Sequence, residues 1–126
     1  MNNNKTDAKE LLDELKSFSG TEHYYRSSFG RLRLTDGMHF LRERASCYWL
    51  VDVVESVQHL AKIQEYAGFI VWQIRVSGNK AVVSAWNDTP GESEKLYVQE
   101  IEYTDFPLKE FEFYQVGDVL LLKGEY

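Results

Sequence analysis

Short apolar runs joined by two-residue turns fill the second half of this sequence. Residues 69–77 and 81–86 are two such runs, and Gly78 and Asn79 lie between them. Glycine followed by asparagine favours the tight turn of a β-hairpin, because both residues tolerate positive φ better than most others. The pattern therefore predicts two antiparallel strands over these runs.

Further runs of the same kind follow. Residues 96–103 form a third strand-like run, after a polar loop at residues 87–94 that is rich in turn-forming residues. Residues 111–114 and 119–122 are joined through a Gly-Asp pair, and a Gly-X pair suits a type II′ hairpin turn. The second half of the chain is therefore expected to be an antiparallel sheet.

Helical periodicity dominates the first half. An apolar stripe near the N-terminus recurs at the spacing of one helix face and predicts a first helix. The stripe consists of Leu11, Leu12, Leu15 and Phe18. Thr6 or Asp7 can cap the start of this helix, and Gly20 can end it in a left-handed conformation. In residues 29–34 leucines alternate with arginines, which predicts a half-buried strand.

Residues 38–63 have the period of a long amphipathic helix. We expect Thr35 or Asp36 to cap its start, although the Asp-Gly pair at this point would also suit a hairpin turn. The segment is long for one uninterrupted helix. Two helices with a break near Ala45 and Ser46, the serine capping the second, are the alternative.

These patterns predict an α+β fold, with N-terminal helices packed on one face of an antiparallel sheet of about five strands. We expect residues 1–5 to be disordered and residues 6–126 to form a single domain, because 126 residues that are 44% apolar suffice for one core. The single cysteine excludes an internal disulfide, and no run of about 18 apolar residues is present. A cytoplasmic protein without membrane association and without a cofactor is expected.

The acidic charge is concentrated in one half of the sequence. Basic and acidic residues balance in residues 1–63, so the net charge of −6 lies entirely in residues 64–126. Lysine and arginine supply most non-specific affinity for nucleic acid. A nucleic-acid partner is therefore expected only locally, through arginines. The acidic residues could occupy a basic protein by mimicking phosphates, or they could serve solubility alone.

Three residues in the long helical segment could form a chemical site. His39, Glu43 and Cys47 recur four residues apart, so they would share one face of a continuous helix, with Glu43 inside its apolar arc. A partly buried carboxylate has a raised pKa and can act as a general base or metal ligand. Alternatively, Glu43 pairs with an arginine, His39 points to solvent and Cys47 is a small buried apolar residue. No metal site is predicted, because further ligands are not evident.

Arginines form a second candidate site. Arg31 and Arg33 would project from one face of the strand, about 7 Å apart. Together with Arg26 and Arg42 they could bind a phosphate or carboxylate, or stack on a base. A solvated strand face is the simpler interpretation. Trp49 could anchor an interface or pack beneath the N-terminal helix.

Several short motifs resemble a known family. Thr35-Asp36-Gly37, the Tyr-Trp-Leu that follows Cys47, and the Thr-Asp-Phe-Pro of residues 104–107 look like those of small uncharacterised proteins found in bacteria, often on plasmids and phages. The resemblance covers residues 17–126. It implies no activity and no catalytic residues, only the extent of the domain and a mobile-element setting.

Three classes of function are compatible with these observations. The first is a non-catalytic binding protein that engages a protein partner, for example as an inhibitor of a host defence or DNA-processing complex. The second is a small enzyme or metal-dependent protein centred on Glu43, His39 and Cys47. The third is a nucleotide or nucleic-acid binder that uses residues 26–33. A homodimer would be compatible with each class.

Overall fold

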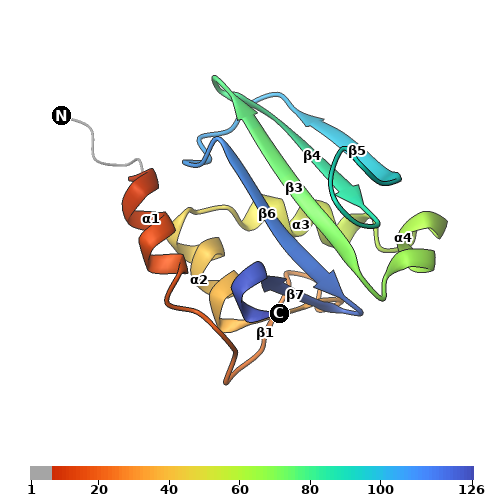
Figure 1. Cartoon of the computed structure of the whole chain (residues 1–126), viewed down its shortest axis with the longest axis horizontal. Coiled ribbons are helices and arrows are strands. Elements are labelled where there is room, and N and C mark those ends of the chain that lie inside the picture. Colours follow the sequence, from red (N-terminus) through yellow and green to blue (C-terminus); the bar gives the residue numbers. More distant parts are fainter. Residues whose placement is uncertain (1–6) are drawn as a thin grey trace.

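A seven-stranded sheet organises the chain. In the computed structural model, which describes residues 7–126, the strands lie in the order β1-β2-β7-β6-β3-β4-β5 (Figure 1). All neighbouring strands are antiparallel except β2 and β7, which are parallel. The expected α+β class and mostly antiparallel sheet are confirmed, whereas the expectation of about five strands is wrong.

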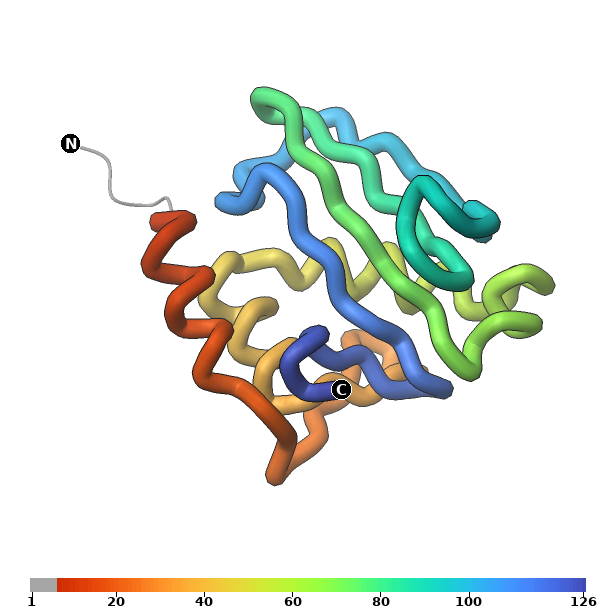
Figure 2. Tube along the Cα trace, in the orientation of Figure 1, coloured from red at the N-terminus to blue at the C-terminus, as the bar shows by residue number. Residues whose placement is uncertain are grey.

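The elements have the following bounds. The helices are α1 Ala8–Leu15, α2 Asp36–Arg44, α3 Tyr48–Ser56 and α4 Ala61–Tyr66, with a final 3-10 turn, η1, at Lys123–Glu125. The strands are β1 Tyr25–Arg26, β2 Arg33–Leu34, β3 Ile70–Ser77, β4 Lys80–Trp86, β5 Lys95–Ile101, β6 Glu110–Val116 and β7 Val119–Leu122. Figure 2 shows that the end of the chain, in dark blue, returns to the orange segment that contains α2.

The hairpin turns are those that the sequence predicts. Gly78 has φ +64° and lies between the paired residues Ser77 and Lys80. Gly117 has φ +65° and connects β6 to β7. In both turns glycine is in the left-handed region, where a side chain would be strained. The local signals of the second half therefore specify its strand pairs.

The helical segment consists of three helices, not one or two. The expected break lies where α2 ends, and Ser46 has φ +51°, which no helix accommodates. Ser46 does not cap the next helix: Cys47 holds the cap position, and no side chain makes a capping hydrogen bond there. Residues 57–60 form a second interruption, before α4, that the periodicity does not predict.

Two other expectations about the first half are wrong. The strand over residues 29–34 is reduced to Arg33 and Leu34, because the preceding residues form a loop in which Gly30 has φ +77°. The first helix begins as expected, with Asp7 accepting a hydrogen bond from the Glu10 amide, but it ends at Leu15. Gly20 is not in the left-handed region. Thr6 and the expected disorder of residues 1–5 lie outside the described residues.

The core lies between the helices and one face of the sheet. Trp72 of β3 and Phe113 of β6 are fully buried, and they join Leu50 and Val54 of α3 in one apolar cluster. In Figure 1, α3 runs behind β6 and β3. The other face of the sheet is more open, and Val98 of β5 is 48% exposed there. Within residues 7–126, no helix has both the length and the apolar character required to cross a membrane.

Candidate functional site

A buried carboxylate fixes the loop between β1 and β2. Glu55 of α3 is only 2% exposed. Its carboxylate accepts hydrogen bonds from the Ser27 hydroxyl at 2.5 Å, the Arg31 amide at 2.8 Å and the Phe29 amide at 3.0 Å. The Ser27 hydroxyl also accepts a hydrogen bond from the Leu32 amide at 2.9 Å. Glu55 thus accepts three of the hydrogen bonds that hold this loop, beside main-chain bonds from the Ser27 amide to Leu32 and from the Gly30 amide to Ser27.

Glu55 remains ionised in this environment. Burial alone would raise the pKa of Glu55, because it disfavours the charged form. The hydrogen bonds from Ser27 and from the amides of Arg31 and Phe29 act in the opposite direction and leave the pKa below its ordinary value. The charged oxygens are therefore strong acceptors for the loop.

The fixed loop exposes an aromatic ring at its tip. Phe29 is 80% exposed, although Phe is normally among the more buried residue types. The neighbouring residues are held as well: the Ser28 hydroxyl donates to Asp52 at 2.7 Å, and the Arg26 guanidinium donates to the Gly30 carbonyl at 3.1 Å. The ring is therefore displayed on an ordered backbone.

Exposed arginines and a tyrosine lie on the strands and loop that carry this ring. Arg26 and Arg33 are paired across β1 and β2 and project from the same side of the sheet. The Arg33 guanidinium lies 5.1 Å from the centre of the Tyr24 ring and makes two hydrogen bonds to Asp118, at 2.9 and 3.2 Å. We call this surface the arginine–aromatic edge. It comprises Tyr24, Arg26, Phe29, Arg31 and Arg33.

Arg42 lies directly beneath the edge. It is 5% exposed, and its Nη1 donates to the main-chain carbonyl of Arg26 at 3.2 Å. Its Nη2 lies 2.9 Å from Nδ1 of His39, and its guanidinium carbon lies 4.5 Å from the centre of the Tyr48 ring. Its Nε is buried without a hydrogen-bond partner. Arg42 thus belongs with Arg26, as the sequence suggested, but inside the protein.

His39 and Glu43 do come close together. Nε2 of His39 lies 3.9 Å from a Glu43 carboxylate oxygen. The imidazole stacks on Tyr25, with the ring centres 3.8 Å apart. Burial is the main cause that lowers the pKa of His39, and the charge of Arg42 adds to it. The neutral imidazole is therefore favoured, with Nδ1 as acceptor for Arg42.

The expectation that Glu43 lies inside an apolar arc is wrong. Its side chain is 55% exposed and accepts a hydrogen bond from the Tyr48 hydroxyl. The predicted arc combined residues of α2 and α3 as if they belonged to one continuous helix. Because the chain breaks after Arg44, the face of α2 that carries Glu43 does not continue into the buried face of α3. The alternative expectation that His39 points to solvent is wrong as well, because its imidazole stacks on Tyr25.

Cys47 and Trp49 take structural positions. Cys47 is 1% exposed, its Sγ lies 3.6 Å from the Leu41 carbonyl, and burial raises its pKa to about 12. A thiol in that state is a poor nucleophile. Trp49 is partly buried and packs against the core. In the described part of the chain, no group of three or more His, Cys, Asp or Glu side chains could hold a metal ion.

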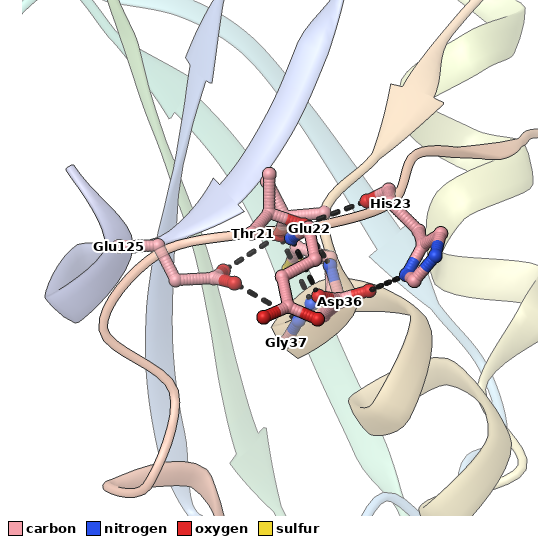
Figure 3. Close-up of polar contacts among 8 residues, drawn as sticks. Thr21, Glu22, His23, Asp36, Gly37 and Glu125 are labelled. Atoms are coloured by element: carbon pink, nitrogen blue, oxygen red, sulfur yellow. Dashed lines mark hydrogen bonds and ion pairs between the residues drawn. The ribbon is translucent and has the colours of Figure 1, made fainter.

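The Thr-Asp-Gly motif begins α2 and anchors the end of the chain. Thr35 caps the helix by accepting from the Met38 amide at 3.3 Å, and its hydroxyl donates to Glu125 at 2.6 Å. The Gly37 amide also donates to the Glu125 carboxylate, at 2.9 Å (Figure 3). A Cβ on Gly37 would lie 2.7 Å from a carboxylate oxygen of Glu125, so the Glu125 side chain would have to shift to admit any other residue.

Asp36 connects the same helix to the preceding segment. Its carboxylate accepts from the Glu22 amide at 2.9 Å, and its own amide donates to the Thr21 hydroxyl at 2.8 Å (Figure 3). The hydrogen bond from Glu22 is the main cause that lowers the pKa of Asp36. The motif therefore explains how residues 21–23 are held, and it contributes no reactive group to the edge.

The acidic residues of the second half are dispersed and partly paired. Glu112 binds Lys123, and Glu94 binds Lys62. Glu110 lies 4.0 Å from Arg75. The charges of these three carboxylates are therefore partly compensated by basic side chains.

The described hollows lie away from Glu43. One of about 170 Å³ at the β3–β5 end of the sheet is lined by Val82, Glu100 and Glu102, together with Arg75 and Lys80. Its basic and acidic groups balance. None of the three candidate reactive residues, His39, Glu43 and Cys47, lines this hollow.

The extent of the domain agrees with a known family. The family model described as "Family of unknown function (DUF6876)" matches residues 9–126. The chain belongs to this family. No curated protein and no solved structure matches it. In this DUF6876 protein the matched residues include the arginine–aromatic edge, Glu55 and the Glu125 anchor.

Sequence reasoning missed the residues that shape the edge. It did not identify Glu55, which follows Val51 by four residues on the buried side of α3. A carboxylate four residues after a buried valine on a helix lies on the same buried face, so its position indicates a carboxylate that must find partners inside the protein. It also missed Phe29, because the apparent strand of residues 29–34 assigned its ring to a sheet face. In this DUF6876 protein the hydrogen bonds from residues 27–31 to Glu55 form what we call the Glu55 clamp. Arg31 contributes its main-chain amide to this clamp, and its exposed side chain does not lie on a strand beside Arg33.

Proposed function

We propose that the protein is a non-catalytic binding protein that docks on a partner protein through the arginine–aromatic edge. One observation carries the proposal: Phe29 is 80% exposed on a loop whose backbone is bound by a buried carboxylate. An exposed ring on an ordered loop gives the isolated protein no packing energy. The same ring would gain that energy in the pocket of a partner.

The order of the loop supports this proposal. Binding normally requires side chains and loops to lose conformational freedom, which weakens affinity. Here the amides of Phe29 and Arg31 are already bound to Glu55, so much of that loss has occurred before the partner arrives. Aromatic and arginine side chains are also those that dominate the binding energy of interfaces.

The charge of the edge indicates an acidic rim on the partner. Arg26 and Arg31 are exposed, and neither makes an ion pair among the described residues. The net charge of −6 opposes binding to nucleic acid, which requires several neutralised phosphates. A protein pocket with carboxylates at its rim therefore fits the edge better than a nucleic acid does. A nucleotide or oligonucleotide is the second candidate partner, because Tyr24 and Phe29 could stack on bases.

The enzyme alternative has less support. Cys47 is buried and its pKa is raised to about 12, while Glu43 is exposed and bound to the Tyr48 hydroxyl. The pairing of Glu94, Glu110 and Glu112 with basic side chains likewise makes phosphate mimicry a weaker basis for an inhibitor. An inhibitor of a defence or DNA-processing complex would then use the edge. The mobile-element setting and the cytoplasmic location remain predictions.

Site-specific photo-crosslinking tests the proposal. A photoreactive phenylalanine analogue is placed at position 29 and, as a matched control, at the exposed Val98 position on the opposite part of the sheet. After irradiation in the native host, position 29 is expected to give one discrete crosslinked protein, which Arg31→Ser weakens. A product at twice the mass of the chain would identify a second copy as the partner.

Two outcomes would contradict the proposal. Equal, diffuse crosslinking at positions 29 and 98 would show that the edge has no specific partner. Saturable binding of a single-stranded oligonucleotide at low ionic strength, lost on Phe29→Ser but not on Val98→Ser, would favour the nucleic-acid alternative.

A further inference from the structure

The charge of Arg42 has no anionic partner among the residues that the structure describes. Arginine is always protonated in proteins, and buried charges are normally paired. Yet among residues 7–126 no carboxylate forms an ion pair with the guanidinium of Arg42, a residue that is only 5% exposed. Its Nε also lacks any hydrogen-bond partner. A buried cation in this state is costly unless an anion joins it.

The neighbours of Arg42 compensate its charge only in part. The Arg26 carbonyl and the neutral His39 imidazole are dipoles, and the Tyr48 ring offers its π face. Glu43 is the nearest candidate for a counter-ion on the same helix, but its carboxylate is directed to Tyr48 and His39. The carbonyl oxygen, the imidazole nitrogen and the π face are all electron-rich, so they attract the guanidinium without neutralising it, and among the described residues its Nε–H has no acceptor.

We propose that Arg42 is the receptor for one oxyanion, a carboxylate or a phosphate, presented by the molecule that docks on the arginine–aromatic edge. Anion binding by Arg42 is independent of the proposed function, and only the statement that a docking molecule carries the anion rests on it. The main-chain hydrogen bond to Arg26 places the guanidinium directly beneath this edge. The anion completes the charge balance of the site and satisfies the free Nε–H.

Tyr48 forms the movable cover of this receptor. Its ring lies over the guanidinium, but the residue is 42% exposed, so the ring can turn outward into solvent. The hydroxyl bond to Glu43 holds the ring in place, and the Glu43 charge repels an incoming anion. Removing either restraint is therefore expected to increase anion affinity.

NMR of arginine Nε–H groups tests the inference on the isolated protein. Inorganic phosphate and acetate are titrated separately, and the Nε–H resonance of Arg42 is followed, with that of the exposed Arg75 as an internal control. We expect a saturable shift of the Arg42 resonance with at least one of the two anions. A response to phosphate alone indicates a phosphorylated carrier, and a response to acetate indicates a carboxylate.

Two variants make the test specific. Tyr48→Phe removes the hydroxyl that binds Glu43, and Glu43→Gln removes the negative charge that repels the anion. Each variant is expected to lower the apparent Kd for the anion several-fold while leaving the Arg75 resonance unchanged. The inference is overturned if the Arg42 resonance does not respond, if it only follows that of Arg75, or if it responds without saturation. Anion binding without crosslinking at position 29 would refute the docking proposal alone, and crosslinking without anion binding would refute this inference alone.

Discussion

Residues 21–44 and residues 70–101 are stabilised in different ways. The second segment contains β3, β4 and β5, where β3 and β4 alone pair over seven consecutive residues. The first contains β1 and β2, which pair over two residues, and then α2. Its loops are fixed by carboxylates that reach it from distant parts of the chain: Glu55 from α3, Asp118 from the β6–β7 turn and Glu125 from η1.

The two segments therefore differ in how many interactions hold each of them in place. A ladder of backbone hydrogen bonds survives the loss of any one side chain, because the backbone groups remain. A loop in which one carboxylate accepts several of the hydrogen bonds loses much of its support with that side chain. The edge should therefore be the part of the molecule most sensitive to single substitutions and to pH, and the hairpins should be the least sensitive.

The largest effect is expected from Glu55→Ala. The substitution removes three hydrogen bonds to a buried charge and leaves the amides of Phe29 and Arg31 without acceptors, which should lower the free energy of unfolding by about 3 kcal/mol. The matched control is Asn87→Ala in the β4–β5 loop, where one exposed side chain accepts from the Glu94 amide. The control should cost about 1 kcal/mol or less, since solvent replaces that bond.

Urea denaturation of both variants measures this difference. Equal losses of stability would contradict the contrast between the two segments. Spectra of the Glu55→Ala protein should further show changes concentrated at residues 27–32, and a variant that changes uniformly throughout would mean that Glu55 supports the whole core.

The next effect concerns the glycine at the start of α2. Gly37→Ala would place a Cβ 2.5 Å from Leu122 Cδ1 and 2.7 Å from Glu125 Oε1, so the anchor must shift. Overpacking of this kind costs about 1–3 kcal/mol. Gly20→Ala is the matched control, because nothing lies within 4 Å of its added Cβ.

Thermal denaturation distinguishes these two glycine variants. Gly20→Ala should leave the midpoint unchanged or raise it slightly, since alanine reduces the freedom of the unfolded chain. A tolerated Gly37→Ala, with the Gly37 amide still bound to Glu125, would show that the close approach is not required.

A smaller effect is expected from pH through His39. Burial, followed by the charge of Arg42, lowers the pKa of His39 in the folded protein. The unfolded chain therefore takes up this proton first, so the contribution of His39 to stability is complete above about pH 6.5 and decreases as the pH falls towards the folded-state pKa. The difference in unfolding free energy between the wild type and His39→Asn should shrink between pH 8 and pH 5. A difference that is constant over this range would contradict the neutral imidazole.

The smallest effect is expected at the surface pair of Arg33 and Asp118. Both side chains are about half exposed, at 44% and 55%, and solvent and salt screen such pairs. Asp118→Asn should change stability least of the four substitutions, and the change should vanish at high salt. A loss as large as that of Gly37→Ala would show that this pair is essential to β1 and β2.

The parts that sequence predicted are those with local signals. Gly78 and Gly117 identify the two hairpin turns, and Thr35 identifies the start of α2. Each of these signals depends on only a few neighbouring residues, because the local backbone geometry of a turn or helix start favours particular residue types. The length of the helical segment likewise indicates a break near Ser46, although Ser46 does not cap the next helix.

The parts that sequence did not predict depend on contacts between distant residues. Nothing near Leu34 indicates that β2 pairs in parallel with β7, 86 positions further along the chain at Leu120. Nothing near Phe29 indicates that a carboxylate of α3 will bind its amide. The candidate site could therefore be located only roughly, by its arginines, while the clamp and the exposed ring required the folded structure.

Amide hydrogen exchange of Phe29 and Arg31 tests most directly whether the edge is ordered before it binds. Both amides lie in a surface loop, and both donate to Glu55. They should exchange well below the rate of an unprotected amide in the wild type, and at close to that rate after Glu55→Ala, with the β3–β4 amides unaffected. Rapid exchange of both amides in the wild-type protein would contradict the account, because a mobile loop would not present Phe29 in one position.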